Sequence, residues 1–280
     1  MKNKKIMVIS LSSPCKMEKI YKSKLFAEQF GFEVVLGRNI ALKKNYLAGS
    51  DEERAEDFEK ALSDKSVDIV WFSRGGYGSM RILEKLDKIK VNGEKTIIGY
   101  SDATAIFFWA LKRNELKLLY GPSFSELFNE KEYNKKSLIN SIYEKKFKIK
   151  CSGESFKKEI KIVGGCLSIV VSLLGTKYFP EVNGKFLFLE DVNEPMYKLD
   201  RMITQLKLCG VFEKVEGLIL GSLSRINGGD YKTFLKVVKE ATGEKKPILF
   251  NRKIGHCKRK ITLPLNFKAN WDKDNLCFFY

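Results

Sequence analysis

One serine stands where a catalytic nucleophile could be placed. In the stretch "KTIIGYSDATAIFFWALKR", residues 95–113, an apolar pair is closed by Gly99, and Ser101 occupies the tip of the turn that follows. A serine at a sharp strand-to-helix turn is typical of a nucleophile elbow, whose pattern G-x-S-x-G is met here except for Ala103 at the last position. A serine before a helix is also a common N-cap. The turn by itself therefore leaves two interpretations of Ser101 open, a helix cap and a nucleophile.

A nucleophilic serine needs a base and a carboxylate that orients the base, and the chain offers few candidates. Its one histidine, His256, lies in a Gly-His turn after the apolar segment "PILF", and histidine is the usual base for a serine. Glu190 ends the apolar run "FLFLE", with Asp191 and Glu194 as neighbouring candidates for the carboxylate. Ser101, Glu190 and His256 each stand at the end of an apolar segment, which makes them a candidate triad.

A glycine-rich turn, "RGGYG" at residues 74–78, follows another apolar segment. It lacks the G-x-x-x-x-G-K-[ST] pattern of a phosphate loop, and no G-x-G-x-x-G opens the next helix. Its glycines can serve a plain turn. Because glycine has no Cβ, they can also bring backbone N–H groups close to a reacting atom.

The elements around these turns alternate between strand and helix. We expect strands at residues 6–12, 32–37, 67–72 and 96–99, and helices at residues 17–30, 50–64, 80–87 and 103–113. Ser50 with Glu53 three residues later predicts a capping box at the second helix. Apolar strands that alternate with helices predict an α/β fold with a parallel sheet covered on both faces. Ligands bind such sheets beyond the carboxyl ends of the strands, where the serine turn and the glycine turn both fall.

The second half of the chain repeats the alternation after a polar, lysine-rich middle. We expect a Gly-Gly turn into a helix at residues 162–179, and strands at residues 184–192 and 216–223. The stretch 196–215 predicts a helix that ends near Gly210, residues 231–243 predict another helix, and short strands are expected after residue 245. The middle is interpreted as a helix plus a connection. The predicted organisation is an N-terminal domain at residues 1–125, a connection at residues 126–160 and a C-terminal domain at residues 161–280.

Composition narrows the class of protein. The chain has 280 residues and a formal net charge of +17, a balance that can indicate a nucleic-acid or membrane partner. The basic residues are mostly lysines interspersed with glutamates, without zinc-finger spacing, an RNP-like motif or basic heptads. We therefore expect a solvated lysine-rich surface and no nucleic-acid partner. No apolar run approaches the roughly 20 residues that span a bilayer, so no membrane partner is expected.

The N-terminus and the cysteines indicate the compartment. The apolar part of "MKNKKIMVISLSSPC" is shorter than a secretory signal core, and no A-x-A-like cleavage site follows it. The six cysteines are scattered without a C-x-x-C pair, which argues against a disulfide framework and against a zinc site. A cytoplasmic protein with reduced thiols is expected.

Several longer stretches form one ordered set over nearly the whole chain. They are "YLAGSDEERAEDFEKAL", "SRGGYGS", "GYSDATAI", "YGPSF", "GGCLSIVVSLLGTKYFP", "FLFLEDVNEPMYKLDRMITQLKLCGVF", "GLILG", and "IGH" followed by "ITLPLN". In this set the chain resembles the LD-carboxypeptidase family of serine peptidases, which includes muramoyl-tetrapeptide carboxypeptidases and microcin-immunity peptidases. The resemblance implies a flavodoxin-like N-terminal domain, a smaller α/β C-terminal domain and a site between them.

The same resemblance assigns roles to residues. It implies that Ser101 is the nucleophile, Glu190 the orienting acid and His256 the base, with the backbone N–H groups of Gly76 and Asp102 as the oxyanion hole. It implies a reaction without cofactor or metal, in which terminal D-alanine is released from a murein tetrapeptide during cell-wall recycling. It also suggests a homodimer. An immunity-type peptidase that cleaves an aminoacyl-nucleotide amide, and a non-catalytic basic binding protein, remain as alternatives.

Overall fold

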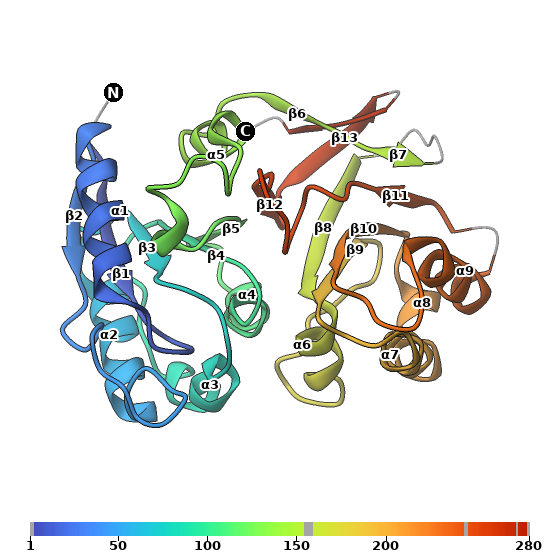
Figure 1. The fold of residues 1–280 in the computed structure, drawn as a ribbon, viewed down its shortest axis with the longest axis horizontal. Helices are drawn as coiled ribbons and strands as arrows, with labels where there is room; N and C mark the ends of the chain where they lie inside the picture. Colours follow the sequence, from blue (N-terminus) through green and yellow to red (C-terminus); the bar gives the residue numbers. More distant parts are fainter. Residues whose placement is uncertain (1–2, 154–158, 244–245, 273, 279–280) are drawn as a thin grey trace.

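Two β-sheets divide the molecule into two lobes that stand side by side (Figure 1). The computed structural model describes residues 3–153, 159–243, 246–272 and 274–278. None of the helices in these ranges is long and apolar enough to cross a membrane. The two-sheet α/β architecture confirms the predicted fold class.

The first sheet has the strand order β12-β5-β4-β3-β1-β2. Its five parallel strands are β1 (Lys5–Ile9), β2 (Glu33–Leu36), β3 (Ile69–Phe72), β4 (Lys95–Gly99) and β5 (Leu116–Tyr120). The order 2-1-3-4-5 is that of flavodoxin-like sheets. The sixth strand, β12 (Leu263–Leu265), comes from the far end of the chain and pairs antiparallel with β5.

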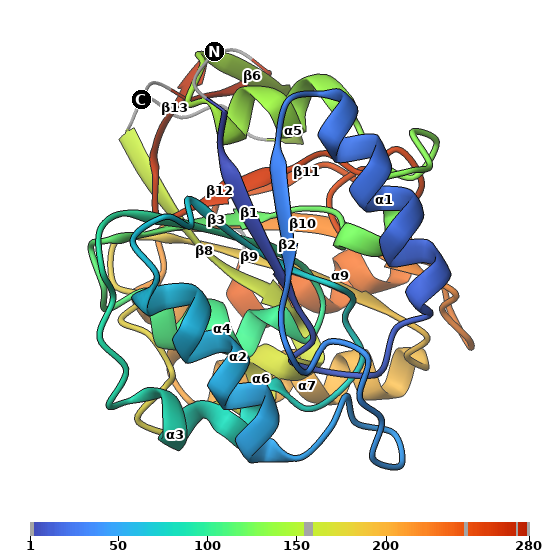
Figure 2. The ribbon, with the colours of Figure 1, turned by 90° about the vertical axis from the view of Figure 1, so that its left-hand side faces the viewer.

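Helices cover both faces of this sheet because successive strand residues point to opposite sides. Ile6 and Val8 of β1 belong to a core packed under α1 (Met17–Gln29), η2 (Phe124–Glu126) and α5 (Lys135–Ile142). Met7 and Ile9 belong to the core under α2 (Asp51–Ser63), η1 (Ser79–Ile82), α3 (Leu83–Leu86) and α4 (Ala103–Ala110). Figure 2 shows α1 and α2 on opposite sides of the strands.

The predicted capping box starts α2. Ser50 Oγ accepts a hydrogen bond from the Glu53 N–H at 3.2 Å, and the Glu53 carboxylate accepts one from the Ser50 N–H at 2.7 Å. Two of the unpaired N–H groups at the helix start are thereby satisfied, as the sequence pattern predicted.

The second sheet is mixed, with the order β6-β14-β13-β8-β9-β10-β11-β7. Its parallel centre is β8 (Glu159–Cys166), β9 (Phe186–Val192), β10 (Gly217–Ser224) and β11 (Ile248–Phe250). Antiparallel strands flank it: β6 (Phe147–Lys150), β7 (Ser152–Gly153), β13 (Lys268–Asp272) and β14 (Asn275–Phe278). The helices of this lobe are α6 (Leu167–Ser172), α7 (Met196–Leu208), α8 (Val211–Lys214) and α9 (Tyr231–Thr242).

Two local predictions were wrong. The Gly164–Gly165 pair is not a turn but lies inside β8, and α6 begins only at Leu167. A Cβ on Gly164 would stand 2.0 Å from the Phe188 carbonyl oxygen, so glycine there permits the close approach of β9. The strand β5 was not predicted at all.

The middle of the chain contains more structure than the predicted helix plus connection. It holds α5, β6, β7 and the start of β8, while residues 154–158 of the expected connection lie outside the described residues. Because β12 returns to the first sheet, the C-terminal part of the chain contributes to both lobes. The division at residues 125 and 160 stays a prediction.

Candidate active site

Ser101 lies in the turn between β4 and α4 with a φ of 63°, a left-handed conformation that is uncommon for a residue with a Cβ. The N-cap of α4 is Asp102, and no side-chain hydrogen bond caps this helix. Ser101 therefore does not cap α4. Its strained backbone and its place beyond a parallel strand are the features of a nucleophile elbow.

Glu190 and His256 lie directly against each other. The His256 Nδ1 atom is 2.8 Å from Glu190 Oε2 and 3.0 Å from Oε1, and the backbone N–H of His256 donates to Oε2 at 2.8 Å. Gly255 makes this approach possible, because it has a φ of 106° and a Cβ on it would stand 2.2 Å from Glu190 Oε2. When Nδ1–H donates its hydrogen bond to the carboxylate, the Nε2 atom of the neutral ring carries the lone pair and can act as a base.

The environment of His256 favours its protonated form. Burial, the largest single influence, lowers the pKa of the ring. The charge of Glu190 and its hydrogen bond act in the opposite direction, and together with Asp191 they raise the pKa of His256 above its ordinary value of 6.5. A carboxylate that stabilises the imidazolium is what a serine mechanism requires of its acid.

Tyr120, at the end of β5, joins Glu190 to the serine turn. Its phenol donates to Glu190 Oε1 at 2.6 Å and accepts a hydrogen bond from the Ser101 N–H at 3.0 Å. Burial, followed by the charge of Glu190, raises the pKa of this phenol well above its ordinary value, so it remains a donor. Sequence reasoning missed Tyr120. Its position could have indicated it, because Tyr120 ends the apolar segment 116–120, for which no strand was predicted, and directly precedes a glycine.

The glycine turn at residues 74–78 packs directly against Ser101. A Cβ on Gly75 would stand 2.9 Å from Ser101 Cβ and 3.1 Å from Ser101 Oγ, while one on Gly76 would meet Ser13. Any larger residue at position 75 would therefore press against the serine. The glycine turn therefore lies directly beside the Ser101 side chain, and Gly75 and Gly76 line the same cavity as Ser101.

Asp102 holds the serine turn to its neighbours. Its fully buried carboxylate accepts hydrogen bonds from Ser12 Oγ at 2.6 Å and from the Ser79 N–H at 2.8 Å. Its side chain therefore points into the N-terminal lobe. The part of Asp102 that the sequence predicts for the oxyanion hole is its backbone N–H, the group that follows the nucleophile in an elbow.

The two other acids considered for the triad point elsewhere. Asp191 accepts hydrogen bonds from the Ser168 N–H and the Val192 N–H, both at 2.8 Å. Glu194 lies 3.9 Å from Lys198 on α7. Of the three acids in and just after β9, only Glu190 contacts the histidine ring.

A second group of side chains that the sequence did not suggest surrounds the ring. Tyr100 contacts His256 edge-on with 4.9 Å between ring centroids, and Lys260 lies 5.0 Å above the Tyr100 ring. Glu126 accepts hydrogen bonds from both, at 3.1 Å from the Tyr100 phenol and at 2.9 Å from Lys260 Nζ. The Lys260–Glu126 ion pair thereby holds the Tyr100 ring, against which the histidine packs.

Ser101 and His256 line one cavity of about 920 Å³ between the lobes. Glycines 75 and 76, Tyr100 and Glu126 come from the first lobe, and Asn193 and Arg225 come from the loops after β9 and β10. The described residues include no hydrogen bond between Ser101 Oγ and the histidine ring, a contact that often tightens only when substrate binds. Within the described ranges, no three His, Cys, Asp or Glu side chains are grouped as a metal ion would need.

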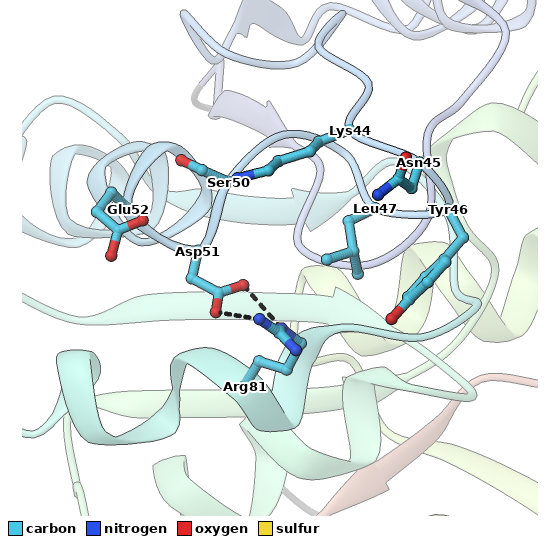
Figure 3. A pocket seen from close by; sticks show the side chains of 8 residues that line it. All are labelled: Lys44, Asn45, Tyr46, Leu47, Ser50, Asp51, Glu52 and Arg81. Carbon is cyan, nitrogen blue, oxygen red and sulfur yellow. Dashed lines mark hydrogen bonds and ion pairs between the residues drawn. The ribbon is translucent and has the colours of Figure 1, made fainter.

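A second hollow, of about 310 Å³, lies on the N-terminal lobe between the loop before α2 and η1. Figure 3 shows Arg81 reaching both carboxylate oxygens of Asp51, with Tyr46 and Lys44 along the rim. It holds none of the residues proposed for catalysis.

Comparison with known proteins identifies a family over most of the chain. Residues 6–121 match the LD-carboxypeptidase N-terminal domain, and residues 159–270 match the LD-carboxypeptidase C-terminal domain. The chain is 30% identical to the probable murein peptide carboxypeptidase of Bacillus subtilis, over 94% of this chain and 86% of that protein.

Solved structures share the fold. The microcin C7 self-immunity protein MccF in its wild-type apo state has a TM-score of 0.89 at 24% identity, covering 100% of this chain and 97% of that one. A muramoyltetrapeptide carboxypeptidase from Oxalobacter formigenes has a TM-score of 0.85 at 24% identity, covering 99% of both chains. The two domain matches and the Bacillus relative together show that this chain belongs to the LD-carboxypeptidase family of serine hydrolases.

Proposed function

We propose that this protein is a serine LD-carboxypeptidase that releases terminal D-alanine from murein tetrapeptides, with Ser101, Glu190 and His256 as its triad. The observation that carries the proposal is the Glu190–His256 pair, which shares a cavity with a serine held in a left-handed turn. The substrate is supported by the name of the Bacillus relative, a probable murein peptide carboxypeptidase.

In the first half of the reaction, Ser101 Oγ attacks the carbonyl carbon of the bond between an L-centre and D-alanine. His256 Nε2 accepts the serine proton, and Glu190 stabilises the resulting imidazolium without being protonated itself. The negative charge that forms on the carbonyl oxygen is accepted by the backbone N–H groups of Gly76 and Asp102. One such donor is worth roughly 3–4 kcal/mol in the transition state.

The tetrahedral intermediate then collapses. His256 donates its proton to the leaving nitrogen, D-alanine departs as the free amino acid, and the acyl group stays on Ser101. A water molecule, deprotonated by His256, attacks the ester, and the tripeptide acid is released with Ser101 restored. Each proton that His256 takes from one oxygen is returned to a leaving group, so no other acid or base is needed.

We also propose a cytoplasmic homodimer with no nucleic-acid or membrane partner. The scattered cysteines support the compartment, and family resemblance supports the dimer. Light scattering of the purified protein tests the dimer directly. A mass near 32.2 kDa for the particle in solution would contradict it.

One assay tests the reaction. The purified protein and a Ser101→Ala variant are incubated with disaccharide tetrapeptide and, separately, with an aminoacyl sulfamoyl adenylate. Mass spectrometry then follows free D-alanine and free amino acid. Release of D-alanine by the wild type alone is expected. Release of amino acid only from the adenylate would favour the immunity-type activity, and no release from either would favour a binding protein.

A further inference from the structure

The cavity around the proposed triad carries unpaired positive charge. Its lining includes six cationic side chains, Lys16, Lys19, Arg74, Arg225, Lys258 and Lys260, but only two carboxylates, Glu126 and Glu132. Lys260 is already paired with Glu126, and Arg74 donates to the Pro14 carbonyl at 3.3 Å. Arg225 has no ion-pair partner within the residues that the structure describes, and its side chain is exposed to the cavity.

Arg225 and Asn193 are positioned by the same strands that position the acid. Val192 of β9 pairs with Ser224 of β10, so Asn193 and Arg225 are the next residues beyond the carboxyl ends of two adjacent parallel strands. The Asn193 N–H donates to the Ser224 carbonyl at 3.0 Å. Asn193 is only three residues beyond Glu190. The strands that position the acid therefore also hold Asn193 and Arg225 at a fixed place relative to it.

Both residues have a left-handed backbone, with φ of 62° at Asn193 and 57° at Arg225. Asparagine adopts a left-handed backbone more readily than most residues, whereas for arginine, which has a Cβ that glycine lacks, this conformation is strained. Of the seven non-glycine residues with positive φ in the described ranges, three line this one cavity, and the third is Ser101. A register shift between Leu220 and Leu223 of β10 redirects the strand just before Arg225. Strain and irregular strands of this kind concentrate at functional sites.

We propose that Arg225 and Asn193 form a subsite that binds a carboxylate of the substrate; this inference rests on the proposed peptidase function. The guanidinium presents paired N–H donors that match the two oxygens of a carboxylate. The Asn193 amide adds a further donor beside it. The carboxylate comes either from the leaving D-amino acid or from the side chain of the residue before the scissile bond.

Steady-state kinetics of three variants tests the subsite. Arg225→Gln should raise KM by about tenfold to a hundredfold, the range for losing a charged hydrogen bond, with kcat nearly unchanged. Asn193→Asp keeps the shape and the tolerance of a left-handed backbone but adds a repelling charge, so it should raise KM as well. Arg201→Gln, on the outer helix α7, removes the same charge from the same lobe and serves as the matched control.

A fourth variant separates binding from folding. Arg225→Gly should relieve the left-handed strain and therefore keep or raise the melting temperature, while it raises KM as Arg225→Gln does. A purely structural role would show the reverse, with a lower melting temperature and an unchanged KM. If all Arg225 variants have the KM of Arg201→Gln on every substrate, the proposal is overturned.

Three substrates identify the source of the carboxylate. They are a tetrapeptide with L-lysine before D-alanine, the same peptide with diaminopimelate, and the lysine peptide ending in D-alaninamide. An Arg225→Gln effect that disappears with the amide assigns the terminal carboxylate. An effect confined to diaminopimelate assigns the side-chain carboxylate. Either result supports the subsite.

A readout without turnover distinguishes failure of the subsite from failure of the proposed function. Phenylglyoxal modification of each arginine is followed by peptide mass spectrometry, with N-acetyl-L-lysyl-D-alanine or its terminal amide present. Slower modification of Arg225 with the carboxylate, and unchanged modification of Arg201, supports the subsite even if no peptide is hydrolysed. Equal rates at Arg225 with both probes, together with no protection by N-acetyl-diaminopimelyl-D-alaninamide, or protection of Arg74 alone, overturn it.

Discussion

Two hollows of this molecule are lined by charged side chains, but their charges are arranged differently. In the hollow of Figure 3, Asp51 is bound by Arg81 through two hydrogen bonds and is also paired with Arg54, while Glu52 is paired with Lys85. Three of the four charged side chains that line this hollow, Asp51, Glu52 and Arg81, are therefore paired, and the fourth is Lys44. In the cavity between the lobes, cations outnumber carboxylates, and three left-handed residues face the space.

This difference indicates how to separate a structural charge cluster from a site. Paired surface charges contribute little free energy and leave no donor for a ligand. A left-handed backbone at a residue with a Cβ costs free energy, and such strain concentrates at functional sites. The proposed triad lies in the second kind of hollow.

Ser101→Ala should lower kcat by at least about 10⁴-fold, because triad members act as a unit and loss of the nucleophile removes the acyl-enzyme route. The melting temperature should be close to that of the wild type, since Ser101 Oγ does not cap α4. Ser172→Ala, which removes an exposed hydroxyl from α6, is the control for loss of a serine side chain. Turnover by Ser101→Ala within tenfold of the wild type would remove the serine from the mechanism.

Glu190→Gln should lower kcat by about 10³–10⁴-fold, because an amide cannot stabilise the imidazolium and can present an N–H to Nδ1, which favours the wrong tautomer. Glu194→Gln is the matched control, because Glu194 lies against Lys198 and not against the ring. It should retain activity within about twofold. The opposite order of sensitivity would mean that the acid had been assigned to the wrong residue after β9.

The pH dependence should follow His256. A base must be neutral, so the rate should rise about tenfold per pH unit and level off above the pKa of the ring, which lies above 6.5. The stability contribution has the opposite sign. Because the folded pKa is raised, protonation stabilises the fold, fully below the unfolded pKa near 6.5 and no longer once the pH has risen through the folded pKa.

The single histidine makes this measurement unambiguous. The imidazole signals in an NMR titration belong to His256 alone. Their midpoint should match the kinetic midpoint in the wild type and should move to lower pH in Glu190→Gln, because the charge and hydrogen bond that raise the pKa are gone. A midpoint that does not respond to Glu190→Gln would show that the carboxylate is not coupled to the ring in solution.

Tyr120→Phe should lower kcat by about tenfold to a hundredfold, because small displacements of catalytic groups have effects of this size. It leaves the buried Ser101 N–H without its partner and removes one donor from Glu190, so stability should also fall by about 1–3 kcal/mol. Tyr133→Phe is the control. Its buried phenol donates to the Leu127 carbonyl away from the cavity, so it should lose stability without losing activity. Equal kcat in the two variants would leave Tyr120 with a structural role only.

Tyr120 also illustrates which features the sequence could not predict. Its contact with Glu190 spans 70 residues and joins two sheets, so no local pattern carries it. The strand that positions it was missed because Lys117 interrupts a short apolar segment that directly follows a helix. The Gly164–Gly165 pair was interpreted as a turn because the reasons for the glycines come from other elements. The Phe188 backbone lies close to Gly164, and the Thr104 side chain lies close to Gly165.

Features that depend on residues close together in the sequence were predicted well. The capping box at Ser50 depends on residues three positions apart, and its hydrogen bonds are present. The apolar strands that precede Ser101 and Glu190 are bounded by their own turn residues, so both residues were expected at strand ends, where the structure places them. Their roles in catalysis stay predictions, although the structure brings Glu190 and His256 into contact.

Arg81→Gln should have the smallest effect on activity and therefore gives the sharpest test of the comparison between the hollows. The variant removes both hydrogen bonds from Arg81 to Asp51, but Arg54 remains paired with Asp51, so the carboxylate at the start of α2 keeps a buried partner. An exposed ion pair contributes little, so the melting temperature should fall only slightly, and less at high salt. Both kcat and KM should stay within about twofold of the wild type, in contrast to the KM rise expected for Arg225→Gln. If Arg81→Gln instead raises KM for the tetrapeptide, the paired hollow is part of the substrate site, and the pairing of charges does not separate the two hollows.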